Sequence, residues 1–250
     1  MLIFNVYIKL FGYFCFKASY YLDIFSLQLN PMKKLVLPIF ILLTCLVHAQ
    51  NDNFNKFSLE TSFGLNYPIA PTGFSKPIFD GVGVSDFAGP KHFDIGARYM
   101  VSPLYGFKLS YGYDRFQYDG SSLASTFYRM SLEAVVNTTE LFGISYNRRS
   151  TIQIQLHGGF GGTFATSKTN TKDIDRIGHL IVGVRPMFKL SDTFALTTDL
   201  SYLVNFKQHY DYAGNSFVGT NPEGLVGGYV NFSVGVSFYL GDKRVHADFY

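Results

Sequence analysis

Ten ionisable side chains fall on the polar side of a repeating pattern, and they allow two kinds of chemistry. A histidine beside a serine or a carboxylate can activate a nucleophile. His157 and His179 lie on neighbouring predicted strands, with Ser131 or Glu133 one strand further. The competing hypothesis is a network of mutually paired charges, because enclosing an unpaired charge is costly. The ten residues are Asp94, Arg98, Lys108, Asp114, Arg129, Glu133, His157, His179, Arg185 and Asp199.

Metal and cofactor signatures are weak. The histidines are scattered and show neither an HExxH motif nor another paired-ligand spacing. Both cysteines, Cys15 and Cys45, precede residue 50. The glycines between 158 and 162 lie in a predicted strand with no helix after it, so they do not predict a phosphate-binding loop. We therefore expect no metal site and no cofactor.

The side chains named above are positioned by a period-two alternation, which is typical of β-strands. From 57 to 67, aromatic and aliphatic residues alternate with Ser, Glu, Gly and Asn. Each such segment is near the ~10 residues that a tilted strand needs to cross a bilayer. The alternation predicts eight strands, over 57–67, 93–101, 107–114, 128–136, 152–164, 179–189, 194–204 and 230–240.

The two faces of these strands favour an all-β fold, an eight-stranded antiparallel transmembrane β-barrel. Gly, Ser, Thr and a few charges suit the narrow interior of such a barrel, and the apolar face suits lipid. Strand edges cannot be satisfied in lipid, so the barrel must close. A soluble barrel or sandwich is the alternative, with the apolar face as its core. After residue 49 no run of about 18 apolar residues occurs, which excludes a helical membrane bundle.

The connections alternate in length, as long outer loops and short periplasmic turns do in membrane barrels. The exception is 137–150, long but on the short-turn side, which we expect to hold a short helix or an extended hairpin. Pro186 removes a ladder donor and predicts a bulge in the sixth strand. The long connections are 68–91, 117–125, 165–178 and 208–227, and the short ones are 102–106 and 190–193.

Aromatic residues recur in the long connections. Exposed aromatic side chains there can form a binding surface or anchor the barrel rim at the lipid headgroups, and both interpretations stay open. The residues are Phe74, Phe79, Phe87, Tyr210, Tyr212 and Phe217, with Tyr67 at the end of the first strand.

The segment 32–49 predicts a secretory signal peptide. Lys33 and Lys34 form a basic region, 35–46 is apolar, and Ala49 precedes the expected cleavage site. Lipidation at Cys45 is an alternative. Because a signal peptide normally begins the chain, we predict that 1–31 is a start-site artefact or an extension and that 50–250 is the mature barrel.

The charge balance of the predicted mature chain is neutral. The whole chain has 21 basic and 18 acidic residues, of which four lysines and Asp23 precede residue 50, leaving 17 of each. Without a basic excess, nucleic acid is not an expected partner.

The chain resembles the N-terminal barrel domain of OmpA-family proteins over roughly residues 50 to 250. The likeness rests on the signal segment, the strand array, Gly-Ala-Arg-Tyr-Met at 96–100, and Gly-Val-Ser-Phe-Tyr-Leu-Gly at 235–241 followed by basic residues and His246-Ala247-Asp248. It implies an outer-membrane structural or porin-like role in a Gram-negative bacterium. Few residues follow the eighth strand, so the peptidoglycan-binding domain of many members is not expected here.

We therefore expect a non-enzymatic outer-membrane barrel with a structural, envelope-integrity or surface-interaction role through its loops. Its expected partners are outer-membrane lipid, the barrel-assembly machinery and an unknown surface ligand. A barrel-embedded outer-membrane hydrolase and a narrow porin-like channel are the alternatives.

Overall fold

The strands in the computed structural model follow the predicted alternation and are longer than the sequence indicated. The structure describes residues 53–69, 83–120, 123–143, 151–168, 174–216, 218–219 and 222–250. Their elements are β1 (Phe57–Ile69), η1 (Val84–Phe87), β2 (Gly89–Met100), β3 (Tyr105–Gln117), β4 (Ala124–Asn137), α3 (Thr138–Leu141), β5 (Ile152–Ser167), β6 (Asp175–Lys189), β7 (Phe194–Gln208), β8 (Leu225–Leu240) and η2 (Ala247–Phe249). The predicted signal segment and residues 1–31 lie outside the described residues.

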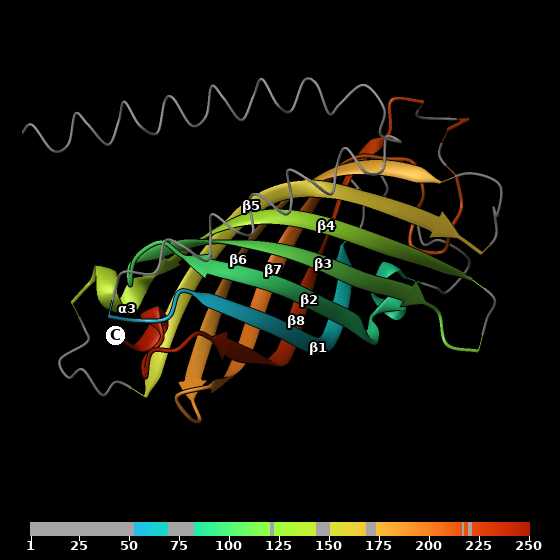
Figure 1. Cartoon of the computed structure of the whole chain (residues 1–250). Coiled ribbons are helices and arrows are strands. Elements are labelled where there is room, and N and C mark those ends of the chain that lie inside the picture. Colours follow the sequence, from blue (N-terminus) through green and yellow to red (C-terminus); the bar gives the residue numbers. More distant parts are fainter. Residues whose placement is uncertain are drawn as a thin grey trace, which may run out of the picture. The chain divides into compact units, whose positions relative to one another are not determined.

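The eight strands form one closed barrel in sequence order, and the predicted fold is confirmed (Figure 1). Every neighbouring pair is antiparallel, and β1 closes the barrel by pairing with β8 from Phe57–Leu240 to Ile69–Gly228. Closure leaves no unpaired strand edge, which is the condition for placing a sheet in lipid. The strands run from 12 residues in β2 to 16 in β8.

The outer face of the barrel is apolar along every strand. Phe63 is 64% exposed and Val182 is 58% exposed, and both are flanked by less exposed neighbours of the opposite parity. Exposed aliphatic and aromatic residues on all eight strands make an apolar surface far larger than a soluble monomer carries. The period-two exposure therefore places the apolar side chains toward lipid and excludes the soluble sandwich, in which they would be the core.

Pro186 does not introduce the predicted bulge. Its strand keeps an unbroken register with β5, in which Pro186 pairs with Ile154. On the other side, the pairing with β7 lapses at Arg185 and Pro186 and resumes at Met187 in the same register. The missing N–H of proline interrupts the ladder for two residues without adding one.

The connection after β4 contains the short helix α3, which was one of the two options for 137–150. The Asn137 side chain accepts a hydrogen bond from the Glu140 N–H and caps its first turn. Residues 144–150 lie outside the described residues. The C-terminus lies at the same end of the barrel as α3 (Figure 1), where Asn137 Nδ2 donates to the Asp248 carbonyl at 3.3 Å.

The apolar face gives a direct test of insertion. Leu109 is 53% exposed in the middle of β3, between Ala97 and Leu132 on the neighbouring strands. A lysine there would lie in hydrocarbon, so Leu109→Lys should lower the free energy of unfolding in vesicles by about 2–4 kcal/mol.

Leu190→Lys is the matched control, because Leu190 is also exposed, at 64%, but follows β6 in a short turn. Its change should stay within about 1 kcal/mol. Equal costs at the two positions in urea titrations would contradict a lipid-facing outer surface.

Candidate functional site

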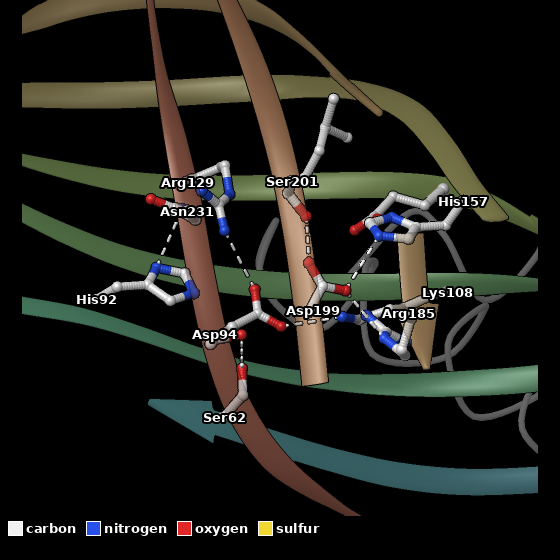
Figure 2. A pocket seen from close by; sticks show the side chains of 13 residues that line it. Ser62, His92, Asp94, Lys108, Arg129, His157, Arg185, Asp199, Ser201 and Asn231 are labelled. Atoms are coloured by element: carbon white, nitrogen blue, oxygen red, sulfur yellow. Dashed lines mark hydrogen bonds and ion pairs between the residues drawn. The ribbon is translucent and has the colours of Figure 1, made fainter. Parts of the chain in front are cut away.

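The ten predicted ionisable residues all lie on the inward parity of their strands, and all except His179 are joined, through Glu60, in one network of ion pairs in the lumen. Arg129 Nη1 donates to Asp114 at 2.8 Å, and its Nη2 donates to Asp94 at 3.3 Å. The Lys108 ammonium lies 3.0 Å from the other oxygen of Asp94. His92 reaches the same Asp114 carboxylate at 2.7 Å. One half of the lumen is therefore a chain of alternating charges, of which Figure 2 shows Arg129, Asp94 and Lys108.

The other half is built in the same way. Arg185 donates to Asp199 at 3.0 Å and to Glu60 at 2.8 Å. His157 lies between two carboxylates, with Nδ1 2.6 Å from Glu133 and Nε2 3.0 Å from Asp199. Figure 2 shows Arg185, His157 and Asp199 converging from separate strands. Asp199 is thus shared by Arg185 and His157, and Arg185 is shared by Asp199 and Glu60, which offsets the desolvation of each.

Glycines make room for the long side chains of this network. A Cβ atom on Gly112 would lie 2.4 Å from Arg129 Nη2, and one on Gly183 would lie 2.3 Å from His157 Nε2. Both distances are shorter than atoms can approach. The small residues of the polar face therefore allow the guanidinium and the imidazole to cross a lumen that eight strands leave narrow.

The sequence analysis left three members out of the network. Glu60 and His92 lie on the same polar parity as the chosen residues, so the alternation could have found them. Asp248 follows the last strand, where no period applies, yet it is fully buried. Arg98 binds it with two hydrogen bonds of 2.6 Å and binds Glu60 at 2.5 Å.

Asp248 belongs to a C-terminal segment that closes one mouth of the barrel. Asn55 fixes this segment through backbone bonds to Val245 and Ala247 and side-chain bonds to Lys243. Behind it, Phe249 packs with Tyr239, Met187 and Ala195. Burial alone would raise the pKa of Asp248, but the Arg98 guanidinium outweighs it and holds the pKa well below its usual range.

The opposite mouth is closed by aromatic side chains, which corrects one expectation. Phe87, Tyr210 and Tyr212 were expected to be exposed, and all three are buried. Phe116 packs edge-on against Tyr212 at 4.6 Å and against Tyr229 at 5.2 Å. Residues of the long connections fill the space between the charge network and this mouth. Phe74, Phe79 and Phe217 lie outside the described residues.

This plug is joined to the strands by hydrogen bonds as well as packing. The Tyr212 hydroxyl donates to the Gly228 carbonyl, and burial raises the pKa of Tyr212 above its usual range. Burial also raises the pKa of Asp211, although Asn215 donates to its carboxylate. Tyr229 extends from the plug to the network, donating to Asp114 at 3.1 Å.

The serine–histidine pair considered for catalysis does form. Ser131 Oγ lies 2.9 Å from His179 Nε2, and the other ring nitrogen lies 2.9 Å from the Thr163 hydroxyl. A hydroxyl thus stands where a triad has a carboxylate to orient and charge the imidazole. All three side chains are buried. Among the described residues, the pair therefore satisfies its own buried polar atoms.

Little space remains inside. The cavity at the centre of the network has a volume of about 20 Å³ and is lined by Ser62, Asp94, Lys108, Arg129 and nine further residues (Figure 2). That volume holds roughly one water molecule. Within the described part of the chain, no three His, Cys, Asp or Glu side chains are grouped to hold a metal ion. Among the same residues, no helix is long and apolar enough to cross a membrane.

Fold and lumen together define the class, an eight-stranded transmembrane β-barrel of the outer-membrane type. No protein-family model and no curated protein matches the chain. Among solved structures it is similar to Neisserial surface protein A, at a TM-score of 0.48 and 12% identity, over 74% of this chain and 97% of that one.

Two further barrels are similar to it. One is the N-terminal β-barrel domain of OprF from Pseudomonas aeruginosa, with a TM-score of 0.42, 12% identity and coverage of 74% and 99%. The other is a major outer membrane protein from Thermus thermophilus, with a TM-score of 0.46, 14% identity and coverage of 74% and 98%.

The buried pair of Arg98 and Asp248 predicts a pH-dependent contribution to stability. Asp248→Asn removes a carboxylate and leaves a buried guanidinium poorly compensated. The free energy of unfolding at pH 7 should therefore fall by about 3 kcal/mol. The folded-state pKa of Asp248 is lowered. Its contribution is therefore complete above about pH 5 and is lost as the pH falls through that lowered value.

Urea titrations in vesicles from pH 7 to pH 3 test this, and the gap between wild type and variant should narrow below about pH 4. Asp242→Asn is the control in the same segment, because the Asp242 side chain is 77% exposed. A gap that is constant with pH, or equal in the control, would refute the assignment.

Proposed function

We propose that the protein is a non-enzymatic outer-membrane barrel of a Gram-negative bacterium, with a role in envelope structure and in surface interaction through its long loops. The observation that carries this proposal is the filled lumen. Paired charges occupy its middle, the C-terminal segment covers one mouth, and Phe116, Tyr212 and Tyr229 fill the other. A barrel with this interior offers its outer face and its loops to other molecules.

The same interior argues against a channel. An ion entering from either mouth would meet packed side chains, and passage would require breaking pairs such as Arg129–Asp114. In planar bilayers the refolded chain should show no stable conductance steps from neutral pH down to about pH 5, where paired carboxylates stay ionised. Reproducible steps from a chromatographically pure barrel would establish the narrow channel instead. A porin inserted under the same conditions is the positive control.

The hydrolase alternative has two observations in its favour, the bond between Glu133 and His157 and the bond between Ser131 and His179, and only the second contains a hydroxyl nucleophile. Ser131→Ala removes the only nucleophile of that pair. A strain lacking the protein should admit a hydrophobic dye that an intact outer membrane excludes. The variant should restore exclusion as well as wild type, since the proposed role needs the barrel and not the hydroxyl.

Leu109→Lys serves as the loss-of-function control, because it disturbs insertion. If Ser131→Ala is present at wild-type abundance but does not restore dye exclusion, the result would point to catalysis and overturn the non-enzymatic role.

The partners follow from the same surfaces. Lipid covers the apolar face, and a surface ligand would meet the loops. For the barrel-assembly machinery, Phe238 supports the last strand as the recognised segment, because it is exposed while Phe249 is buried in the mouth.

A further inference from the structure

One row of aromatic side chains crosses five neighbouring strands on the outer face. Cross-strand register joins the members in sequence, and the rings of Phe63 and Phe93 lie 4.9 Å apart while those of Tyr113 and Tyr128 lie 5.6 Å apart. Aromatic rings gather where hydrocarbon meets the headgroups. The row consists of Phe63, Phe93, Tyr113, Tyr128 and Phe164.

A second aromatic row lies nearer the short turns and fixes the depth of the first. Phe57, Tyr99 and Phe107 are joined by register in the same way. Phe107 precedes Tyr113 by six residues on β3, which is roughly 20 Å along a strand. A tilted strand of that length spans most of an apolar band of about 25 Å. The first row therefore marks the boundary on the long-loop side.

Two cations lie just beyond this boundary, on the same outward face. On β2, Lys91 lies two residues from Phe93 in the direction of the long loops, and on β3, Arg115 lies two residues from Tyr113 in the same direction. Each cation is next to one member of the register pair His92–Asp114. They occupy adjacent strands. Arg115 pairs in turn with Thr126, so hydroxyl groups continue the row across β4. At this height a bilayer presents its headgroups and their phosphates.

The cations are incompletely paired. Arg115 Nε is buried and has no hydrogen-bond partner among the described residues. Lys91 Nζ donates to the Gln117 carbonyl at 3.4 Å and to Asp119 at 3.3 Å, but that carboxylate is 97% exposed, and such a surface pair is weak. At the other mouth, Lys189 and Arg244 both face Asp192.

From this placement we propose that Lys91 and Arg115 bind the phosphate of a lipid headgroup in the outer leaflet, with the acyl chains passing the aromatic row into the apolar band. The site deepens the proposed function and rests on its membrane insertion. The planar guanidinium can donate two parallel hydrogen bonds to phosphate oxygens, and the ammonium adds a point charge. Phe93 and Tyr113 lie below the cations, where the first methylenes of a lipid would begin.

Native mass spectrometry of the full chain, folded in a neutral sugar detergent, tests the site with dioctanoyl phosphatidate as the probe. The double variant K91Q/R115Q should bind it about 25-fold more weakly, at roughly fivefold per cation near a charged surface. The single variant R115Q should account for about fivefold of that loss. The control K189Q/R244Q, with two cations removed at the other mouth, should bind within about twofold of wild type.

Two further probes identify the ligand. Dioctanoylglycerol has the same chains without phosphate and should bind weakly to all variants, and inorganic phosphate should not compete at equal concentration. Unchanged phosphatidate binding by K91Q/R115Q, tight binding of dioctanoylglycerol, or equal binding of inorganic phosphate would each overturn the site.

Insertion is measured separately, by the gel mobility of unheated samples and by protease protection in vesicles. A chain that does not insert contradicts the proposed function. An inserted chain that ignores phosphate contradicts the lipid site alone.

Discussion

Enclosed charge is the constraint on which the rest of this structure depends. Eight strands leave a lumen that side chains nearly fill, and a lipid-covered barrel offers an unpaired charge no escape to bulk water. Carboxylates in the lumen are therefore paired, and some are shared between cations, as Glu60 is between Arg98 and Arg185. Small residues such as Gly112 and Gly183 follow from the same constraint, since the long partners must cross the barrel to meet.

The alternation predicted the strands and the inward side of each polar residue because side-chain direction in a strand depends on parity alone. The partners of each charge could not be predicted. Pairing of Arg129 with Asp114 depends on the register of β3 with β4, and Tyr229 reaches that pair from the far side of the barrel. Register is set by the whole ladder and its turns, which a single segment does not encode.

Two parts of the interior carried no periodic signal at all. Asp248 enters the lumen from a segment held by Asn55, and Tyr212 enters from a connection that looked like an exposed loop. In both cases the cause of burial is the barrel as a whole and not the local sequence, because an open mouth would expose the charge network to water from one side. Aromatic residues in a long connection of a small barrel can therefore be buried in its mouth, as Tyr212 is.

The two ends of the barrel differ in how they are sealed, and this difference bears on function. The end with the short turns is closed by a charged residue bound to Arg98, which ties the C-terminal segment to the central network. The other end, where the long connections join the strands, is closed by rings. Loops fixed on such a plug begin from a rigid base, because Phe116 and Phe127 hold Tyr212 from two strands. Variation in the loops can then occur without disturbing the paired charges below, as the proposed surface role requires.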